Sequence, residues 1–197
     1  MRNLALAVAA YLLGSLPSAY LVVRAARGLD LRSVESGSVG ALNAFRATGS
    51  GWLGAVVLIL DVAKGAAAVL IAGDGAGATT QALAASMVVV GHNYPVWLRG
   101  RGGKGLAAAA GALTVITPLS VPGWAVMWAI GYVSSGYIAL GIVAATAGLP
   151  ILLGFLAGWA YAAATAPACL LVLVRHTAKI RRLLLGTEPK HYWRGRS

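Results

Sequence analysis

The sequence predicts an all-α protein, a polytopic helix bundle integral to a membrane. Hydrophobic residues make up 59% of its 197 residues and charged residues only 11%, whereas a soluble domain typically carries about 25% charged residues. The mean hydropathy is +0.78. Several apolar runs approach the ~20 residues that one helix needs to cross a bilayer, and short basic stretches separate them. These observations favour one integral membrane domain over residues 1–197.

The first predicted helix covers about residues 4–23. Its apolar stretch is longer than the core of about 7–15 residues in a signal peptide, and no convincing small-x-small cleavage site follows it. We therefore expect a retained membrane helix. Pro17 predicts a break or kink between Ser15 and Ser18, which a membrane helix tolerates when its neighbours satisfy the freed backbone groups.

The positions of the basic residues predict the orientation. The formal net charge is +11, and the Lys and Arg residues gather in connections 24–51 and 99–105 and in the tail 175–197. The connection 73–81 has no Lys or Arg. By the positive-inside rule the three basic regions face the cytoplasm, so the N-terminus lies outside and the C-terminus inside. Because these charges flank membrane spans, phospholipid headgroups are nearer partners for them than nucleic acid.

Because the two termini lie on opposite sides of the membrane, the number of membrane-spanning helices must be odd. Helices over about 4–23, 52–72 and 80–98 leave an even number of crossings between Leu106 and Val174. Four short helices there fit breaks at 117–118, 132–136 and 154–158, whereas two helices would be very long. The sequence thus predicts seven membrane helices, with five as the alternative. Seven helices also place residues 132–137 on the cytoplasmic side.

A basic, glycine-rich segment, residues 91–105, follows the third predicted helix. Glycines at 102, 103 and 105 let a ligand approach the backbone N–H groups closely, since no Cβ intervenes. Arg99, Arg101 and Lys104 add positive charge, and a helix beginning near Lys104 would add its dipole. The segment therefore predicts a phosphate-binding site at the membrane surface.

The first basic connection predicts a second oxyanion cradle. Ser36, Gly37, Gly40 and Asn43 precede Arg46, and an arginine can grip a phosphate through two parallel hydrogen bonds. The alternative is a flexible connection whose arginine contacts lipid headgroups.

Other polar residues permit more than one interpretation. His92 could act as a general base or orient a substrate, or be a structural residue at the interface. Asp61 and Lys64 lie one turn apart in a predicted membrane helix, where each charge costs ~2.5–3.5 kcal/mol. We expect them to pair at i, i+3, with a proton or ion relay or support for the substrate site as alternatives. The basic, leucine-rich stretch before Gly186 predicts a helix on the membrane surface.

No metal site and no disulfide are expected. The three histidines, His92, His176 and His191, lack the spacing of metal ligands. Cys169 is the single cysteine, and we expect it to be a small apolar residue inside a helix.

Taken together, the chain resembles the bacterial membrane acyl-phosphate:glycerol-3-phosphate acyltransferases over nearly its whole length. The most specific match is residues 91–96 followed by 102–105. Residues 14–20, 60–65 and 180–188 add support in the same order.

The resemblance implies a cofactor-free enzyme of phospholipid biosynthesis in the bacterial inner membrane, with a cytoplasmic active site. It would make lysophosphatidic acid from acyl phosphate and glycerol 3-phosphate, with the acyl chain in a groove between helices. Matching positions imply catalytic roles for Ser36, Arg46, His92, Asn93 and Lys104. They imply substrate or phosphate binding for Gly37, Gly40, Asn43, Gly102, Gly103, Gly105, Ser134, His176 and Glu188.

Four positions depart from the family pattern. Ser38 and Leu42 stand where the first motif usually has Asn and Thr, Gly131 where an Arg is usual, and Lys179 where an Asn is usual. These departures keep open a second function, a non-catalytic anion- or lipid-binding membrane protein derived from the same scaffold. The His-x-x-x-x-Asp motif of acyl-CoA-dependent enzymes is absent. Acyl-chain preference and oligomeric state stay open.

Overall fold

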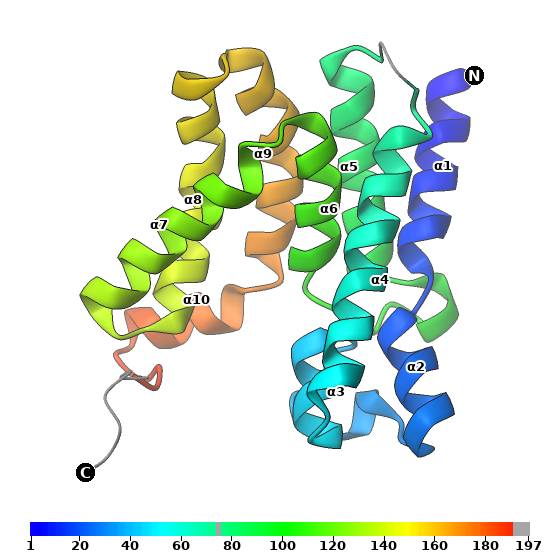
Figure 1. Cartoon of the computed structure of the whole chain (residues 1–197), viewed down its shortest axis with the longest axis vertical. Helices are drawn as coiled ribbons and strands as arrows, with labels where there is room; N and C mark the ends of the chain where they lie inside the picture. The colour runs from blue at the N-terminus through cyan, green and yellow to red at the C-terminus, as the bar shows by residue number, and fades with distance from the viewer. Residues whose placement is uncertain (74–75, 191–197) are drawn as a thin grey trace.

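The computed structural model describes residues 1–73 and 76–190, which contain helices and connections but no strand (Figure 1). Residues 74–75 and the end of the predicted tail, 191–197 with His191, lie outside the described part. The α-helices are α1 (Arg2–Ser15), α2 (Ser18–Arg27), α3 (Ala41–Thr48), α4 (Gly51–Leu70), α5 (Ala78–Asn93), α6 (Leu106–Ile116), α7 (Ser120–Ser135), α8 (Ile138–Leu156), α9 (Trp159–Val174) and α10 (Thr177–Leu184). Two short 3-10 helices, Leu31–Ser33 and Val96–Leu98, lie in the connections.

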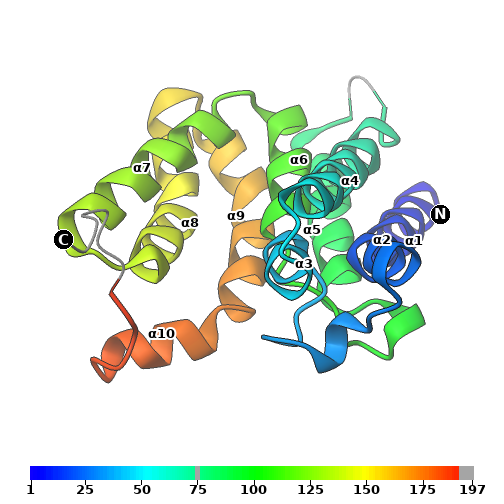
Figure 2. The same cartoon turned by 60° about the horizontal axis from the view of Figure 1, so that its bottom comes forward.

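The long helices run between two ends of a bundle (Figure 1). The N-terminus, the last turn of α4, the first turn of α5 and the α8–α9 connection lie at one end, whereas α2, α3, α10 and the connection before α6 lie at the other. Figure 2 brings this second end forward, with α3 and α10 on its near side. The three basic regions of the sequence therefore gather at one end of the molecule, and the connection that lacks Lys and Arg begins at the opposite end.

Helix packing relies on small residues. α1 packs against α5, α4 against α6, α7 against α8, and α9 against α5 and α8. Where α4 meets α6, a Cβ on Gly65 would collide with the backbone of Ala108, and one on Gly111 with that of Val62. Such close backbone approach is typical of helix packing in membranes.

The predicted break in the first helix is confirmed, because α1 ends at Ser15 and α2 begins at Ser18. Pro17 cannot donate a backbone hydrogen bond. Lys64 of α4 reaches this break, and its Nζ donates to the carbonyl of Leu16 at 2.9 Å. A charged side chain of another helix thus binds a carbonyl at the break, which also accepts from Ser18 N–H at 3.0 Å.

Several element boundaries differ from the expectations. The third helix, expected to reach residue 98, ends at Asn93, because Pro95 and a 3-10 turn follow it. Helix α7 includes 132–135, so only 136 and 137 connect it to α8. The first connection contains the eight-residue helix α3, which packs against α4.

Three helical stretches are long and apolar enough to cross a membrane: Arg2–Arg27, Gly51–Leu70 and Ile138–Leu156. Leu106–Ile116 and Trp159–Val174 are apolar but shorter. The bundle is therefore that of a membrane protein by length and composition.

Candidate active site

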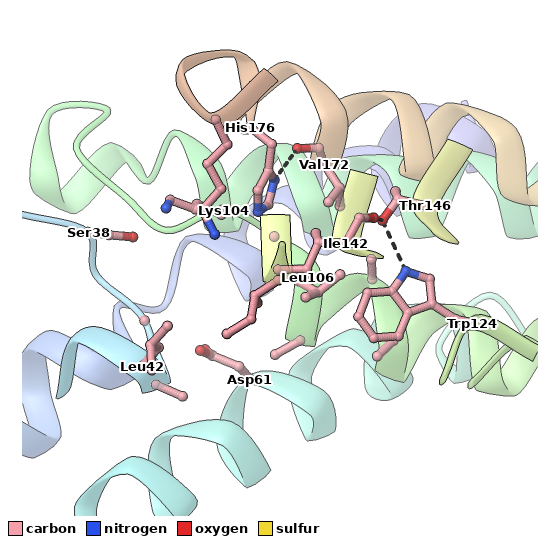
Figure 3. Close-up of a pocket in the computed structure, with 18 of the residues that line it drawn as sticks. Ser38, Leu42, Asp61, Lys104, Leu106, Trp124, Ile142, Thr146, Val172 and His176 are labelled. Carbon is pink, nitrogen blue, oxygen red and sulfur yellow. Dashed lines mark hydrogen bonds between the residues drawn. The ribbon is translucent and has the colours of Figure 1, made fainter. Parts of the chain in front are cut away.

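A cavity of about 780 Å³ is lined in part by residues of α3 and α10. Its polar lining includes Ser36, Ser38, Asn43, Arg46, Asp61, His92, Lys104, His176, Lys179, Arg182 and Glu188. Its apolar lining includes Leu106, Leu113, Trp124, Ile142, Leu149, Cys169 and Val172. In Figure 3, Ser38 and Lys104 lie on one side, whereas Ile142 and Trp124 lie on the other. This arrangement suits an amphiphile with an anionic group and a hydrocarbon chain.

Asn43 of α3 organises the first basic connection. Its Oδ1 accepts hydrogen bonds from the backbone N–H and the hydroxyl of Ser36, at 3.2 and 3.0 Å. Its Nδ2 donates to the carbonyls of Leu31 and Val34, at 3.2 and 3.3 Å. The buried amide is thereby occupied by protein partners, so Asn43 holds Ser36 at the cavity.

The glycine-rich segment folds back on the end of α5. Gly103 N–H donates to His92 O at 3.0 Å, and Gly102 O accepts from Val39 N–H at 3.3 Å, which joins the two basic connections. A Cβ on Gly103 would collide with the His92 imidazole and the Val39 carbonyl. Gly105 has φ +80°, a left-handed conformation, where α6 begins. Glycine is thus required at 103 by packing and at 105 by backbone conformation.

Arg175, at the end of α9, fastens this segment from the other side. Its Nε donates to Gly103 O at 3.0 Å, and its guanidinium lies 5.1 Å from the centre of the Tyr94 ring. Arg175 therefore stabilises the segment through a charge-assisted hydrogen bond and a cation–π contact. This role was not predicted from the sequence, in which Arg175 is one of several basic residues of the tail.

Four cations line the polar end of the cavity, and we refer to Arg46, Lys104, Lys179 and Arg182 as the cationic cluster. Arg182 pairs with Glu188 at 2.5 Å. The other three make no hydrogen bond or close ion pair with any residue that the structure describes. Burial lowers the pKa of Lys104 below its usual value, and the positive charges of Lys179, Arg182, Arg175 and Arg46 lower this pKa further. Burial also lowers the pKa of Lys179. An anion in the cavity would relieve this repulsion.

His176 connects α9 to α10 and is buried. Its Nδ1 lies 2.8 Å from Val172 O, and because a carbonyl only accepts, Nδ1 carries the proton. Burial lowers the pKa of His176, and nearby cations including Lys104 add to the shift. The imidazole is therefore neutral at neutral pH, with the lone pair on Nε2. His176 lies beside Lys104 in Figure 3.

Beneath the polar end, Asp61, Lys64 and His92 form a second charged group, the buried ion network. Asp61 Oδ1 lies 2.8 Å from Lys64 Nζ and 3.6 Å from His92 Nδ1. The predicted i, i+3 pair between Asp61 and Lys64 is confirmed. The sequence did not reveal that Asp61 also contacts His92 on α5 and lines the cavity.

The structure brings most of the predicted site residues to the cavity, but not all of them. Those that line it are Ser36, Gly40, Asn43, Arg46, His92, Lys104, Gly105, His176 and Glu188. Those that do not line it are Gly37, Asn93, Gly102, Gly103 and Ser134.

Asn93 and Ser134 differ most from the expected placement. Asn93 is buried, and its Nδ2 donates to Leu171 O on α9 at 3.3 Å, so in this structure it joins α5 to α9. Ser134 is exposed, and its hydroxyl donates to Ile130 O of its own helix at 2.7 Å.

The departures from the family pattern also have places in the structure. Ser38, Leu42 and Lys179 line the cavity, and Lys179 thereby adds a cation to it. A Cβ on Gly131 would lie 3.0 Å from Gly141 Cα, so Gly131 lets α7 approach α8 closely. Arg182 was not predicted to line the cavity, and for Asp61 support for the substrate site was only one of three alternatives; the clearest signal for Asp61 is a charge inside an apolar run.

Comparison with known proteins gives a consistent result. The family model described as "Glycerol-3-phosphate acyltransferase" matches residues 4–186. Glycerol-3-phosphate acyltransferase 2 of Moorella thermoacetica is 43% identical over 93% of this chain and 94% of its own length. Glycerol-3-phosphate acyltransferase of Synechococcus sp. (strain CC9902) is 41% identical over 100% of this chain and 99% of its own.

Two solved structures share the fold. The crystal structure of PlsY, an integral membrane glycerol 3-phosphate acyltransferase, in its glycerol 3-phosphate form superposes with a TM-score of 0.84 at 33% identity, covering 98% of this chain and 96% of that one. Its lysophosphatidic acid form has a TM-score of 0.81 at 31% identity, covering 96% of this chain and 95% of that one.

Proposed function

This chain belongs to the glycerol-3-phosphate acyltransferase family, and we propose that it uses an acyl phosphate as donor to make lysophosphatidic acid and inorganic phosphate. Acyl transfer to glycerol 3-phosphate follows from the family membership. The observation that supports the donor is the cationic cluster in the polar lining of the cavity, because three of its members make no close ion pair with any residue that the structure describes. Two phosphates, one on each substrate, would supply the missing negative charge.

The proposed reaction requires little covalent chemistry from the protein itself. The glycerol hydroxyl oxygen attacks the acyl carbonyl, the C–O bond to phosphate breaks, and the phosphate leaves with the electron pair. The enzyme holds two anions together and stabilises the departing phosphate. Arg46, Lys104 and the hydroxyl of Ser36 are the groups that we assign to the phosphates. The hydroxyl proton passes to a substrate phosphate or to Nε2 of His176.

We further propose that the chain crosses a bacterial inner membrane seven times, with the polar end of the cavity in the cytoplasm. The helices α1 with α2, α4, α5, α6, α7, α8 and α9 would each cross once. The basic connections share one end of the bundle, which supports this orientation by the positive-inside rule. Cysteine-accessibility labelling in intact cells would test this orientation. Single cysteines introduced at positions 76 and 101 should react with a thiol reagent from opposite sides of the membrane.

The non-catalytic alternative loses support from the site. Ser38 and Leu42 alter the lining of the cavity, but Ser36, Arg46, Lys104 and His176 all line it too. A protein that only bound anions would not require a neutral imidazole beside them. The family membership likewise favours the enzyme.

The purified protein, incubated with labelled glycerol 3-phosphate and either acyl phosphate or acyl-CoA, tests the donor. We expect lysophosphatidic acid from acyl phosphate alone. Product from acyl-CoA alone would overturn the donor assignment. No product from either donor, with folded protein and an active relative as control, would favour the non-catalytic alternative.

A further inference from the structure

An aromatic side chain that the proposed chemistry does not use lines the apolar part of the cavity. Trp124 of α7 lines the cavity together with Leu113 of α6 and with Thr146 and Leu149 of α8. In Figure 3, Trp124 and Thr146 lie on the opposite side of the view from Ser38 and Lys104. A hydrocarbon chain that extends from Lys104 across the cavity would therefore approach the indole ring.

The route to this ring follows α6. Leu106, where α6 begins, follows Lys104 closely in the chain, and Leu113 lies two turns further along; both line the cavity. At a rise of 1.5 Å per residue, the seven-residue step from Leu106 to Leu113 spans about 10 Å. An acyl chain whose carbonyl lies near Lys104 would follow this wall, and its terminal carbons would approach Trp124.

The indole ring is held in place. Its Nε1–H donates to Thr146 Oγ1 at 3.0 Å, and that hydroxyl donates to Ile142 O at 2.7 Å. Trp128, one turn away, stacks on the ring with centroids 6.4 Å apart. In apolar surroundings an indole N–H without an acceptor is costly, so the ring cannot turn out of the cavity without losing its partner. A fixed wall discriminates between chain lengths, whereas a mobile side chain would adapt.

We propose that Trp124, locked by Thr146, sets the length of acyl chain that the enzyme accepts. This rests on the proposed function, because it concerns the acyl donor of the same cavity. It makes Trp124 a specificity-determining residue and Thr146 a positioning residue that acts through it. Replacing the whole Trp124 side chain by the methyl group of alanine lengthens the apolar part of the cavity, so chains that the wild-type enzyme excludes would fit. Each methylene newly buried is worth about fourfold in kcat/KM.

The test is a competition assay in which one mixture of saturated acyl phosphates, from short to long, is offered to each variant. The chain lengths in the lysophosphatidic acid product are then measured. We expect Trp124→Ala to shift the product distribution toward longer chains, and Trp124→Phe to shift it less. Thr146→Val keeps the side-chain volume but removes the acceptor, and it should broaden the distribution. Trp52→Ala is the matched control, since Trp52 is 74% exposed on α4 and does not line the cavity.

Active Trp124→Ala and Trp124→Phe variants with the wild-type distribution would overturn the proposal. If Trp124→Ala does not fold, Trp124→Phe and Thr146→Val decide the question, and unchanged profiles in both overturn it. A wrong donor assignment would give a different result from a wrong role for Trp124. If the enzyme does not use acyl phosphates, the wild-type protein will be inactive with every chain length in the mixture. An acyl-CoA series would in that case reveal the same shift if Trp124 sets the length.

Discussion

The cationic cluster and the buried ion network both place charge near the same cavity, but they are balanced differently. In the network Asp61 lies between Lys64 and His92, and Lys64 also satisfies a backbone carbonyl. In the cluster only Arg182 makes a close ion pair among the described residues, and the pKa of Lys104 is lowered by burial and by neighbouring cations. Charge that is balanced within the protein holds helices together, whereas charge left unbalanced is available to a ligand. The variants below are designed to test that distinction.

The largest effect is expected from removing the carboxylate of the network. Asp61→Ala leaves the charge of Lys64 buried without its partner, which typically costs about 3–5 kcal/mol. The melting temperature in detergent should fall steeply and expression should decrease. Replacing both members, Asp61→Leu with Lys64→Met, should recover part of the stability, because an apolar pair removes the uncompensated charge. Equal destabilisation by the single and double variants would contradict a structural role for the pair.

The next largest effect should appear in activity and not in stability. Lys104→Ala removes a group that we place on a substrate phosphate, and a hydrogen bond to a charged group is worth about 1.5–3 kcal/mol. We expect kcat/KM to fall at least tenfold while the melting temperature stays the same or rises, because the repulsion within the cluster decreases. Arg101→Ala is the matched control, since Arg101 lies in the same segment but is exposed and does not line the cavity. Near-normal turnover of Lys104→Ala would refute the assignment.

The smallest effect is a pH dependence of substrate binding. The protonated amine of Lys104 attracts the phosphate of glycerol 3-phosphate, and the neutral amine does not. Because its pKa lies below the ordinary 10.5, KM should rise with pH already below that value. Lys104→Arg should flatten this rise, since a guanidinium stays charged. Lys179→Ala should move the rise to higher pH, because it removes one of the cations that lower the pKa of Lys104. A profile unchanged in both variants would mean that another group titrates.

Much of the fold and of the site could be predicted from sequence because the signals are local. Apolar runs predict membrane helices wherever they occur, and Pro17 breaks the first helix through its own covalent geometry. The segment 91–105 is recognisable because its glycines and cations are consecutive. Lys104 and His92 were therefore expected at the site, whereas His176 was expected there only from the family resemblance, and all three line the cavity.

Helix α3 was not predicted, because its eight residues within a polar connection do not form an apolar run long enough to indicate a membrane helix. Its packing against α4 is a tertiary contact. Asn43 was expected to bind phosphate, and only the folded chain reveals that its amide is occupied by Ser36, Leu31 and Val34.

By itself the sequence predicted the long helices, the break at Pro17, the grouping of basic connections and most of the polar residues that line the cavity, since each depends on neighbours in the chain. Only the tertiary structure decided that Asp61 contacts His92, that Arg175 fastens Gly103 from 72 positions away, and that Asn93 points to α9 instead of the cavity. Which faces of two helices meet depends on close packing summed over the whole bundle. These helix–helix contacts therefore cannot be predicted from any short stretch of sequence.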